Sequence, residues 1–236
     1  MSAPEISIVI PIYNEEAILH AAIVDLRERL GPFGWSYEVV LAENGSRDAT
    51  QLVAEELSKK YPEVRFFSFG APNYGGALRR GIELATGDIV LCDEIDLCDT
   101  DFHRRAVELL RRGEADMVIG SKLIAGARDD RPWARHAASQ LYNGLLRATL
   151  GFKGTDTHGL KAFRRSALLP IARDCVVEKD VFASEFVIRA YREGLRIREI
   201  PVRVMEKRIP SINLLSRVPN VLKSLAKLTW AIRVRR

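Results

Sequence analysis

Short apolar runs alternate with longer amphipathic stretches through the first half of the chain. The apolar runs have the length of buried strands, and strands are therefore expected at residues 6–10, 38–41, 64–69, 89–92 and 117–119. The amphipathic stretches have the helical period, and helices are expected at residues 15–30, 48–60, 75–85 and 101–112. This alternation predicts an α/β fold in which helices cover both faces of a mostly parallel sheet.

The pattern is less regular in the second half, from about residue 120 onward. It predicts, in order, helix 132–150, a bend rich in Gly and Thr at 151–159, helix 181–193, strand 196–204 and a terminal helix from about residue 213. We therefore expect one domain over residues 1–212, divided into a regular half (1–120) and a less regular half (121–212), followed by a helix over 213–236.

Polar clusters follow four of the expected strands. They lie at residues 11–15, 43–48, 73–76 and 93–96. Ligands of open α/β sheets bind at the carboxyl ends of the strands, because the loops there leave a crevice. The candidate functional residues of the first half are therefore those that come directly after each strand.

The cluster at residues 93–96 contains three carboxylates, Asp93, Glu94 and Asp96. At a strand end these groups repel one another, and a hard divalent cation with oxygen ligands relieves that repulsion. Such a cation would also neutralise charge on a diphosphate leaving group. The alternative is a solvated acidic loop that caps the helix beginning near Asp101. The residues alone leave both interpretations open.

Two other strand ends have both a binding and a structural interpretation. Asn73 opens a segment with paired glycines and two arginines, which suits either a phosphate contact or a tight turn before a surface helix. This segment is neither a dinucleotide-binding fingerprint nor a P-loop. Glu43 is a candidate acceptor for the N–H groups of a nucleobase, whereas Ser46 and Asp48 are expected to cap the next helix.

Candidate phosphate ligands occur in the second half. Arg131, Arg135 and Ser139 fall on roughly one face of the expected helix, and Lys122 lies upstream. They would bind a phosphate if that face lines a cleft, and as exposed residues they would need no special explanation. His158 is either a structural residue of the bend or a group that orients a hydroxyl. Four histidines without ligand spacing argue against a zinc site.

Charge and apolar content limit the partners and the compartment. The 236 residues carry a net charge of +5, which suits anionic partners such as nucleotides, lipid phosphates or membrane surfaces. The sequence has neither a signal-peptide pattern nor an apolar run long enough to cross a bilayer, and its three cysteines form no CxxC pair, so we expect a cytoplasmic protein. From Leu214 onward an apolar helical stripe has basic flanks, which suits either a membrane interface or packing on the domain.

Taken in order, these segments resemble family 2 glycosyltransferases of the GT-A fold, and within that family the polyprenyl- and dolichyl-phosphate sugar synthases. The likeness spans nearly the whole chain. It rests on residues 11–15, 43–48, 73–81, 85–88, 93–96, 120–122, 133–139, 156–161 and 199–202, followed by Arg208 and Ser211. Single segments are weak signals, whereas their shared order is a strong one.

The resemblance implies transfer from a nucleoside-diphosphate sugar, GDP-mannose or a UDP-hexose, to a polyprenyl phosphate, with Mg²⁺ or Mn²⁺ and inversion at the anomeric carbon. Residues 1–120 would then hold the nucleotide sugar and 121–212 the acceptor. The donor-binding candidates are Pro11, Tyr13, Glu15, Glu43, Asn73, Gly76, Arg79 and Asp93. The candidate catalytic residues are Asp96, Glu94, Arg135 and Arg208, with Glu94, Asp96 and Asp93 as metal ligands. The acceptor phosphate would contact Lys122, Arg131, Arg135 and Ser139.

Several residues depart from the family pattern. Glu94-Ile95-Asp96 replaces the usual Asp-x-Asp, with Asp93 as a substitute ligand, and Glu43-Asn44 replaces a common Asp-Asp. Lys122 replaces a frequent Arg and so loses bidentate phosphate geometry. His158-Gly159-Leu160 replaces a Ser-Gly-Phe pattern, which points to a different acceptor.

The leading hypothesis is an inverting glycosyltransferase, peripheral on the cytoplasmic face of the membrane. The same donor chemistry with a soluble or protein-linked hydroxyl acceptor is an alternative, and so is a catalytically silent scaffold that binds sugar nucleotides. A nucleic-acid-binding module is disfavoured, because the basic residues are scattered and lack interleaved aromatic residues.

Overall fold

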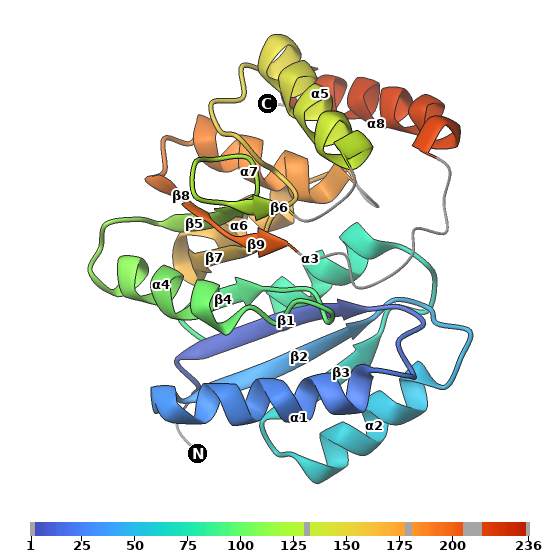
Figure 1. Cartoon of the computed structure of the whole chain (residues 1–236), viewed down its shortest axis with the longest axis vertical. Helices are drawn as coiled ribbons and strands as arrows, with labels where there is room; N and C mark the ends of the chain where they lie inside the picture. The colour runs from blue at the N-terminus through green and yellow to red at the C-terminus, as the bar shows by residue number, and fades with distance from the viewer. Residues whose placement is uncertain (1–2, 130–132, 178–180, 205–213, 235–236) are drawn as a thin grey trace.

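A seven-stranded sheet in the order β3-β2-β1-β4-β7-β5-β8 forms the centre of the molecule (Figure 1). The structure is a computed structural model that describes residues 3–129, 133–177, 181–204 and 214–234. Its strands are β1 (Ile6–Ile12), β2 (Tyr37–Glu43), β3 (Val64–Ser68), β4 (Ile89–Cys92), β5 (Met117–Ser121), β7 (Lys161–Arg164) and β8 (Ile197–Pro201). A separate ribbon pairs β6 (Arg128–Asp129) with β9 (Arg203–Val204) in parallel.

Helices cover both faces of this sheet. They are α1 (Leu19–Leu30), α2 (Thr50–Lys60), α3 (Tyr74–Leu84), α4 (Thr100–Arg111), α5 (Trp133–Leu150), α6 (Arg165–Asp174), α7 (Phe182–Arg192) and α8 (Leu214–Val234), with a short 3₁₀ turn at Gly31–Phe33. Neighbouring strands from β3 to β4 are parallel, and so are β5 and β8. The predicted α/β fold with a mostly parallel sheet is therefore confirmed.

Strand β1 shows why the sheet needs cover on both sides. Its side chains Ile6, Ile8 and Ile10 pack into a core shared with α1, α2 and α4, whereas Val9 points into the core formed by α3, α5, α6, α7 and α8. All four are fully buried. Each contributes about 1.5–3 kcal/mol relative to an exposed side chain. Such continuous burial is typical of a parallel strand with helices on both faces.

Strand β7 and helix α6 are absent from the sequence-based prediction. β7 lies between β4 and β5 and is antiparallel to both. It is short and begins with Lys161, so its apolar signal falls below that of the parallel strands. The helix that follows contains Pro170, which weakens its helical pattern. The predicted strand 196–204 is divided in two, with β8 ending at Pro201.

The segment 85–88 has a structural role at the opposite end of the sheet from the strand-end loops. The buried Glu38 carboxylate accepts hydrogen bonds from Ser7 Oγ at 2.6 Å and from Thr86 N and Oγ1, both at 2.8 Å. Gly87 passes so close to β1 that an added Cβ would lie 2.7 Å from the carbonyl carbon of Ile6. This network joins the connection between α3 and β4 to β1 and β2.

Candidate active site

The carboxyl ends of β1 and β4 mark the point where the chain order of the sheet reverses. From β1 the chain moves to β2 and β3 on one side, and β4 lies on the other side. The pairing of β1 with β4 ends at Val9 and Cys92, whereas β1 continues beside β2 to Ile12. The strands therefore separate beyond Val9, at a position where α/β sheets bind ligands. Pro11 lies in this separated part and has no N–H group to donate.

Hydrogen bonds fix the loop after β1 to the loop after β2. Asn14 has a positive φ of 55°, and its amide donates to Ser46 Oγ at 3.0 Å. The Glu15 amide donates to Thr50 Oγ1 at 2.7 Å. Tyr13 is 38% exposed beside these contacts. These bonds replace the first helical turn predicted from residue 15, and α1 begins at Leu19.

Glu43 is buried and organises the end of β2. One carboxylate oxygen accepts a hydrogen bond from the Ser46 amide at 2.5 Å, and the other accepts from Ser68 Oγ at 2.5 Å. Each oxygen keeps a second lone pair. The predicted capping of α2 is found in part. The N-cap residue is Ala49, without a side-chain cap bond, but Asp48 accepts from the backbone amide of Thr50 in the first turn at 3.0 Å, whereas Ser46 accepts from Asn14. Nucleobase recognition by Glu43 stays a prediction.

The segment after β3 forms the start of α3. Asn73 is its N-cap, and its side-chain oxygen accepts from the Gly76 amide at 2.9 Å. A Cβ at Gly76 would lie 2.6 Å from the Phe69 side chain and 2.9 Å from the Asn73 side chain, so any larger residue would require one of these side chains to shift. Arg79 donates to the carbonyl of Cys175 at 3.0 Å. The structure thus gives these three donor-site candidates roles in local structure.

The three carboxylates after β4 do not form one cluster. Asp93 is buried, its Oδ2 lies 2.5 Å from His103 Nε2, and its Oδ1 accepts from the Glu94 amide at 2.7 Å. Both carboxylate oxygens of Asp93 therefore have hydrogen-bond partners inside the protein. The alternative role for the acidic run, capping α4, belongs instead to Asp99, which accepts from the Phe102 amide at 2.9 Å. Glu94 and Asp96 are left as the pair that a cation would contact.

The electrostatics at Glu94 support that role. Glu94 is exposed to solvent, and the surrounding protein partly desolvates its carboxyl group. This desolvation, followed by the charges of Asp96 and Asp93, raises the pKa of Glu94 to about 7, against smaller opposing effects of Lys122 and Lys161. Negative charge is therefore crowded at this position.

The two carboxylates of Glu94 and Asp96 fit a divalent cation that a bound diphosphate also coordinates. Among the described residues, no group of three or more His, Cys, Asp or Glu side chains is arranged to hold a metal ion. Mg²⁺ usually binds through one or two carboxylates, with phosphate and water oxygens in its remaining positions. Glu94 and Asp96 supply two carboxylates, so a nucleoside diphosphate would have to complete the site.

Lys122 lies at the end of β5 and is held by a buried acid. Its Nζ donates to Asp156 Oδ2 at 2.7 Å, and the two side chains are 10% and 1% exposed. Burial opposes ionisation of Asp156, but the charge and hydrogen bond of Lys122 and the amide of His158 outweigh it and lower its pKa. Glu199 fixes the same loop, since its Oε1 accepts from the Thr155 amide at 2.7 Å.

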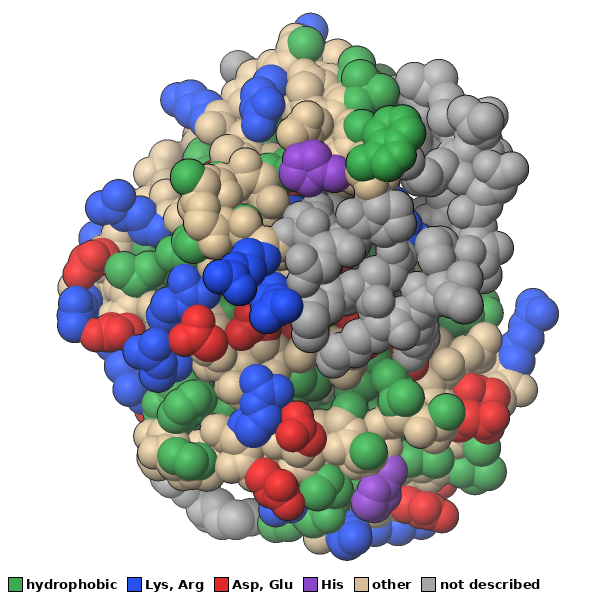
Figure 2. Space-filling model, in the orientation of Figure 1, with side chains coloured by type: hydrophobic (Ala, Val, Ile, Leu, Met, Phe, Trp, Pro, Cys, Tyr) green, Lys and Arg blue, Asp and Glu red, His purple; other side chains and the backbone are tan. Residues whose placement is uncertain are grey.

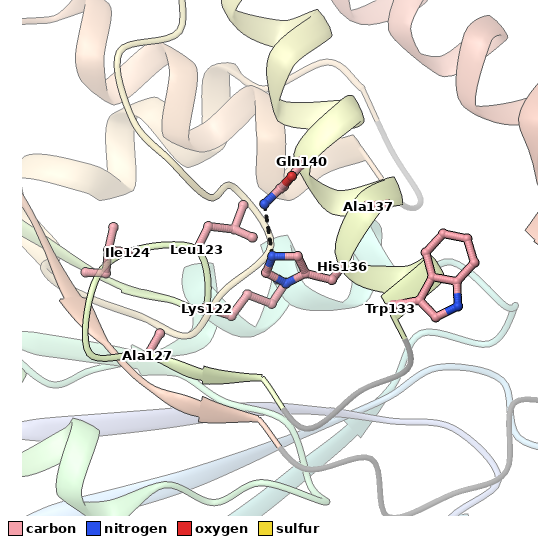
Figure 3. Close-up of a pocket in the computed structure, with 8 residues that line it drawn as sticks. All are labelled: Lys122, Leu123, Ile124, Ala127, Trp133, His136, Ala137 and Gln140. Carbon is pink, nitrogen blue, oxygen red and sulfur yellow. Dashed lines mark hydrogen bonds between the residues drawn. The ribbon is translucent and has the colours of Figure 1, made fainter.

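A cavity of about 530 Å³ opens between the loop after β5 and the first half of α5 (Figure 3). Its lining is mostly apolar with three polar side chains, namely Leu123, Ile124, Ala127, Trp133 and Ala137 with Lys122, His136 and Gln140. His136 and Gln140 hydrogen-bond to each other at 2.9 Å along one face of α5. The cavity therefore combines an apolar wall with polar groups at Lys122, His136 and Gln140.

The predicted phosphate ligands lie on different parts of this region. Lys122 lines the cavity, whereas Arg135 and Ser139 share the neighbouring face of α5 with Tyr142, whose ring centroid lies 5.3 Å from that of His158. Arg135 and Ser139 are each partly buried. Arg131 and Arg208 lie outside the described residues.

Two buried basic residues beside the acidic run are absent from the sequence-based prediction. His103 lies in the apolar stripe of α4 with Phe102, Ala106 and Val107. A titratable residue in such a stripe needs a polar partner from the sheet, and this signal was available in the sequence. Lys161 is 4% exposed at the start of β7, and its Nζ donates to the Gly159 carbonyl at 2.7 Å. Because β7 gives no clear strand signal in the sequence, the position of Lys161 does not follow from the sequence pattern.

Helix α8 packs its apolar stripe on the domain. Leu225, Leu228 and Ile232 are buried in the core shared with α5 and α7. The opposite face exposes Lys223 and Lys227, and Trp230 is 54% exposed. The packing alternative is therefore confirmed for this part of the helix, and the outer face keeps a basic and aromatic character. No helix in the described ranges has the length and apolar content needed to span a bilayer.

Charges elsewhere on the surface compensate one another locally. Figure 2 shows Lys and Arg side chains mixed with Asp and Glu over the region of α4. There Arg104 and Arg105 both pair with Asp101, at 3.0 and 2.9 Å. These arginines therefore contribute less to attraction toward an anionic surface than Lys223 and Lys227 would.

Comparison with known proteins identifies the family of this α/β domain. The model of glycosyl transferase family 2 matches residues 7–170. The chain belongs to this family. The glycosyltransferase class inferred from the strand-end loops is confirmed.

Curated relatives include one named as a glycosyltransferase and one named as an undecaprenyl-phosphate 4-deoxy-4-formamido-L-arabinose transferase. The glycosyltransferase AglD of Haloferax volcanii is 31% identical over 236 residues, covering 98% of this chain and 38% of the relative. The undecaprenyl-phosphate 4-deoxy-4-formamido-L-arabinose transferase of Edwardsiella ictaluri is 29% identical over 206 residues, covering 86% of this chain and 60% of the relative. The chain thus spans less than two thirds of either relative.

Solved structures share the fold. Glucosyl-3-phosphoglycerate synthase from Mycobacterium tuberculosis with UDP has a TM-score of 0.68 and 23% identity, covering 96% of this chain and 80% of that chain. A complex of the same enzyme with Mn²⁺, UDP and glucosyl-3-phosphoglycerate has a TM-score of 0.67 and 19% identity, covering 97% of this chain and 80% of that chain. At this identity the likeness supports the GT-A fold.

Proposed function

We propose that this protein transfers a sugar from a nucleoside-diphosphate sugar to a polyprenyl phosphate. The single observation that carries the proposal is the position of Glu94 and Asp96, beside the point where β1 and β4 separate. The relative from Edwardsiella ictaluri is named for undecaprenyl phosphate, and the structural neighbour binds UDP and Mn²⁺. These names support the choice of donor and acceptor class.

On the donor side, Pro11, Tyr13 and Glu43 border the proposed nucleotide pocket. Glu94 and Asp96 would hold Mg²⁺ or Mn²⁺ together with the diphosphate. A bound divalent cation would neutralise the charge that builds on the leaving diphosphate. This neutralisation would stabilise the transition state by several kcal/mol. The rigid loop after β1, fixed by its hydrogen bonds to the loop after β2, keeps the nucleotide side of the crevice in place.

On the acceptor side, Lys122 and His136 would contact the phosphate of the lipid. The Nζ group of Lys122 has three N–H donors and uses one on Asp156. Leu123, Ile124 and Trp133 form an apolar wall of the same cavity, which suits the first hydrocarbon units next to the phosphate. Arg135 and Ser139 remain candidate phosphate ligands on the adjoining face of α5.

The proposed reaction needs no protein base. An acceptor phosphate oxygen is already ionised near neutral pH, so it attacks the anomeric carbon directly. The bond from that carbon to the diphosphate oxygen breaks as the new bond to the acceptor phosphate forms, with inversion and release of the nucleoside diphosphate. The work of the protein is positioning and charge neutralisation.

We propose peripheral contact with an anionic membrane through the outer face of α8. Lys223 and Lys227 are exposed on this face, and Trp230 lies one turn further on. Each basic residue near such a surface contributes about 1 kcal/mol. Co-sedimentation with vesicles that contain anionic lipid tests this. Lys223→Glu combined with Lys227→Glu should weaken binding, and equal binding of that variant would contradict the contact.

Incubation with radiolabelled UDP- and GDP-sugars and a polyprenyl phosphate, followed by extraction into organic solvent, tests the transfer. We expect labelled lipid with one donor and its loss in Asp96→Asn. Activity with a hydroxyl acceptor and none with the lipid phosphate would favour the alternative acceptor class. Nucleotide binding without transfer or donor hydrolysis would favour a catalytically silent scaffold.

A further inference from the structure

A buried pair of polar side chains lies directly behind the proposed metal-binding carboxylates. His103 of α4 and Asp93 at the end of β4 approach to 2.5 Å, between Nε2 and Oδ2. Their side chains are 1% and 0% exposed. His103 lies on the buried side of α4 with Phe102 and Ala106. Its position is therefore one where an apolar side chain would be expected.

This pair is a poor choice for stability alone. His103 Nδ1 is buried and has no hydrogen-bond partner among the described residues. An unpartnered buried nitrogen opposes folding, and replacing a buried charged or polar pair with well-packed apolar residues is often neutral or stabilising. A reason for its presence must therefore be sought in what the pair contacts.

The second oxygen of Asp93 accepts a hydrogen bond from the Glu94 amide at 2.7 Å. The Asp93 amide in turn donates to the Val9 carbonyl at 3.0 Å, which fixes the start of this loop to β1. Thus α4 reaches, through His103 and Asp93, the peptide group that precedes the Glu94 side chain. A displacement of Asp93 would reorient Glu94.

Glu94, whose backbone N–H is held by Asp93, also begins the turn that carries Asp96. The Glu94 carbonyl accepts from the amides of Leu97 at 2.9 Å and Cys98 at 3.1 Å. Cys98 has a positive φ of 42°, which is unusual for a residue with a side chain. Hydrogen bonds to both the N–H and the carbonyl of Glu94 therefore hold this turn in a specific conformation, and the direction of both carboxylates depends on the backbone of Glu94.

We propose that His103 is a positioning residue that, through Asp93, aims the carboxylates of Glu94 and Asp96 at a divalent cation bound with a nucleoside diphosphate. This inference rests on the donor site proposed above. It assigns a function to two residues that touch neither nucleotide nor metal. It also explains why Asp93, although adjacent to the two carboxylates, points into the protein.

Removing the whole pair separates positioning from stability. In the double variant Asp93→Met with His103→Leu, apolar side chains replace both polar groups and no buried carboxylate is left alone. We expect its thermal unfolding temperature to equal or exceed that of the wild type. His103→Gln is the matched conservative variant, because its side-chain amide can donate to Asp93 in place of Nε2.

Calorimetry with UDP and with GDP, each with and without Mn²⁺, provides the readout. For the wild type we expect Mn²⁺ to strengthen binding of one nucleotide. In the double variant we expect this Mn²⁺-dependent gain to fall about 10- to 100-fold, as is typical when groups behind metal ligands are removed. Metal-free nucleotide binding should be unchanged, and His103→Gln should recover most of the gain.

Two results would overturn the proposal in different ways. If the wild type gains affinity with Mn²⁺ and the folded double variant gains equally, His103 and Asp93 do not position the carboxylates, and the donor site stands. If the wild type shows no Mn²⁺-dependent binding of either nucleotide, the donor site itself is wrong and the positioning role falls with it.

Discussion

The buried ion pair of Lys122 and Asp156 gives a quantitative test of how the acceptor side is built. Asp156→Asn keeps the shape of the side chain and removes its charge, which leaves the Lys122 ammonium, only 10% exposed, without its partner. Breaking a buried pair in this way costs about 3–5 kcal/mol. We expect the free energy of unfolding, measured by urea denaturation with circular dichroism, to fall by about that amount at pH 7.

A double-mutant cycle identifies the cause. Lys122→Met combined with Asp156→Asn removes both charges, so the double variant should be more stable than Asp156→Asn alone. The exposed pair of Lys59 and Glu55, at a similar 2.7 Å but with side chains 72% and 45% exposed, is the control, and its loss should cost about 0.3–0.5 kcal/mol. Equal losses for the buried and the exposed pair would refute the reasoning.

The pH dependence of the Asp156→Asn penalty follows from the direction of the pKa shift. Folding lowers the pKa of Asp156 below its ordinary value of 3.8, so the folded state favours the ionised carboxylate. The stabilisation is therefore fully present at a pH above the pKa of Asp156 in the unfolded state, at about pH 4–5 and higher. It is lost as the pH falls through the lower pKa of the folded state. The difference between wild type and Asp156→Asn should shrink in acid, and a constant difference down to the acid transition would contradict it.

Three further predictions concern the donor site, a close backbone contact and the terminal helix. Partial desolvation and neighbouring charges raise the pKa of Glu94 to about 7, so the folded protein favours its protonated form below that pH. Mn²⁺ should therefore bind more tightly at pH 8 than at pH 6 and release a proton, and identical affinity would contradict this. Gly159→Ala would place a Cβ 1.7 Å from a backbone oxygen of β5 and should lower the free energy of unfolding, measured in urea, by about 3 kcal/mol or more. Gly144→Ala, which has open space around it, should not lower this free energy. Equal stability of the two variants would be inconsistent with the contact. Leu228→Ala should lower the free energy of unfolding by about 2–5 kcal/mol because its side chain is fully buried, while Lys227→Gln on the exposed face should change it by less than about 0.5; a neutral Leu228→Ala would show that the helix does not pack as described.

The packing of α8 also limits one way of testing membrane contact. Deleting residues 214–236 would remove Leu225, Leu228 and Ile232 from the core, so lost activity after deletion would reflect unfolding as much as a lost lipid contact. Charge reversal at Lys223 and Lys227 leaves this core intact and is the better perturbation.

The regular first half of the fold was predictable because its strands are buried on both faces. Residues such as Ile6 to Ile10 form continuous apolar runs, and the helices between them keep a clear period. Strand β7 lacks this signal, because it is short, starts with Lys161 and runs antiparallel within an otherwise parallel neighbourhood. Neither its direction nor its place between β4 and β5 follows from local pattern.

The candidate site was predictable as a location and less so as a set of contacts. The sequence placed Glu94 and Asp96 at the carboxyl end of a strand, where open α/β sheets bind ligands. It could not show that Asn73 would cap α3, that Asp93 would face His103, or that Lys122 would pair with Asp156, since each partner comes from a distant part of the chain. Such pairings depend on side-chain directions that only the packed structure defines.

Metal-dependent nucleotide binding by wild type and Asp96→Ala tests the donor site most directly. Titration calorimetry with UDP and GDP, with and without Mn²⁺, should show one nucleotide bound more tightly with metal, and this gain should disappear in Asp96→Ala. Asp101→Asn, an exposed carboxylate at the start of α4, is the matched control and should keep the gain. A metal-dependent gain that persists in Asp96→Ala would contradict the assignment of this carboxylate to the diphosphate-binding site.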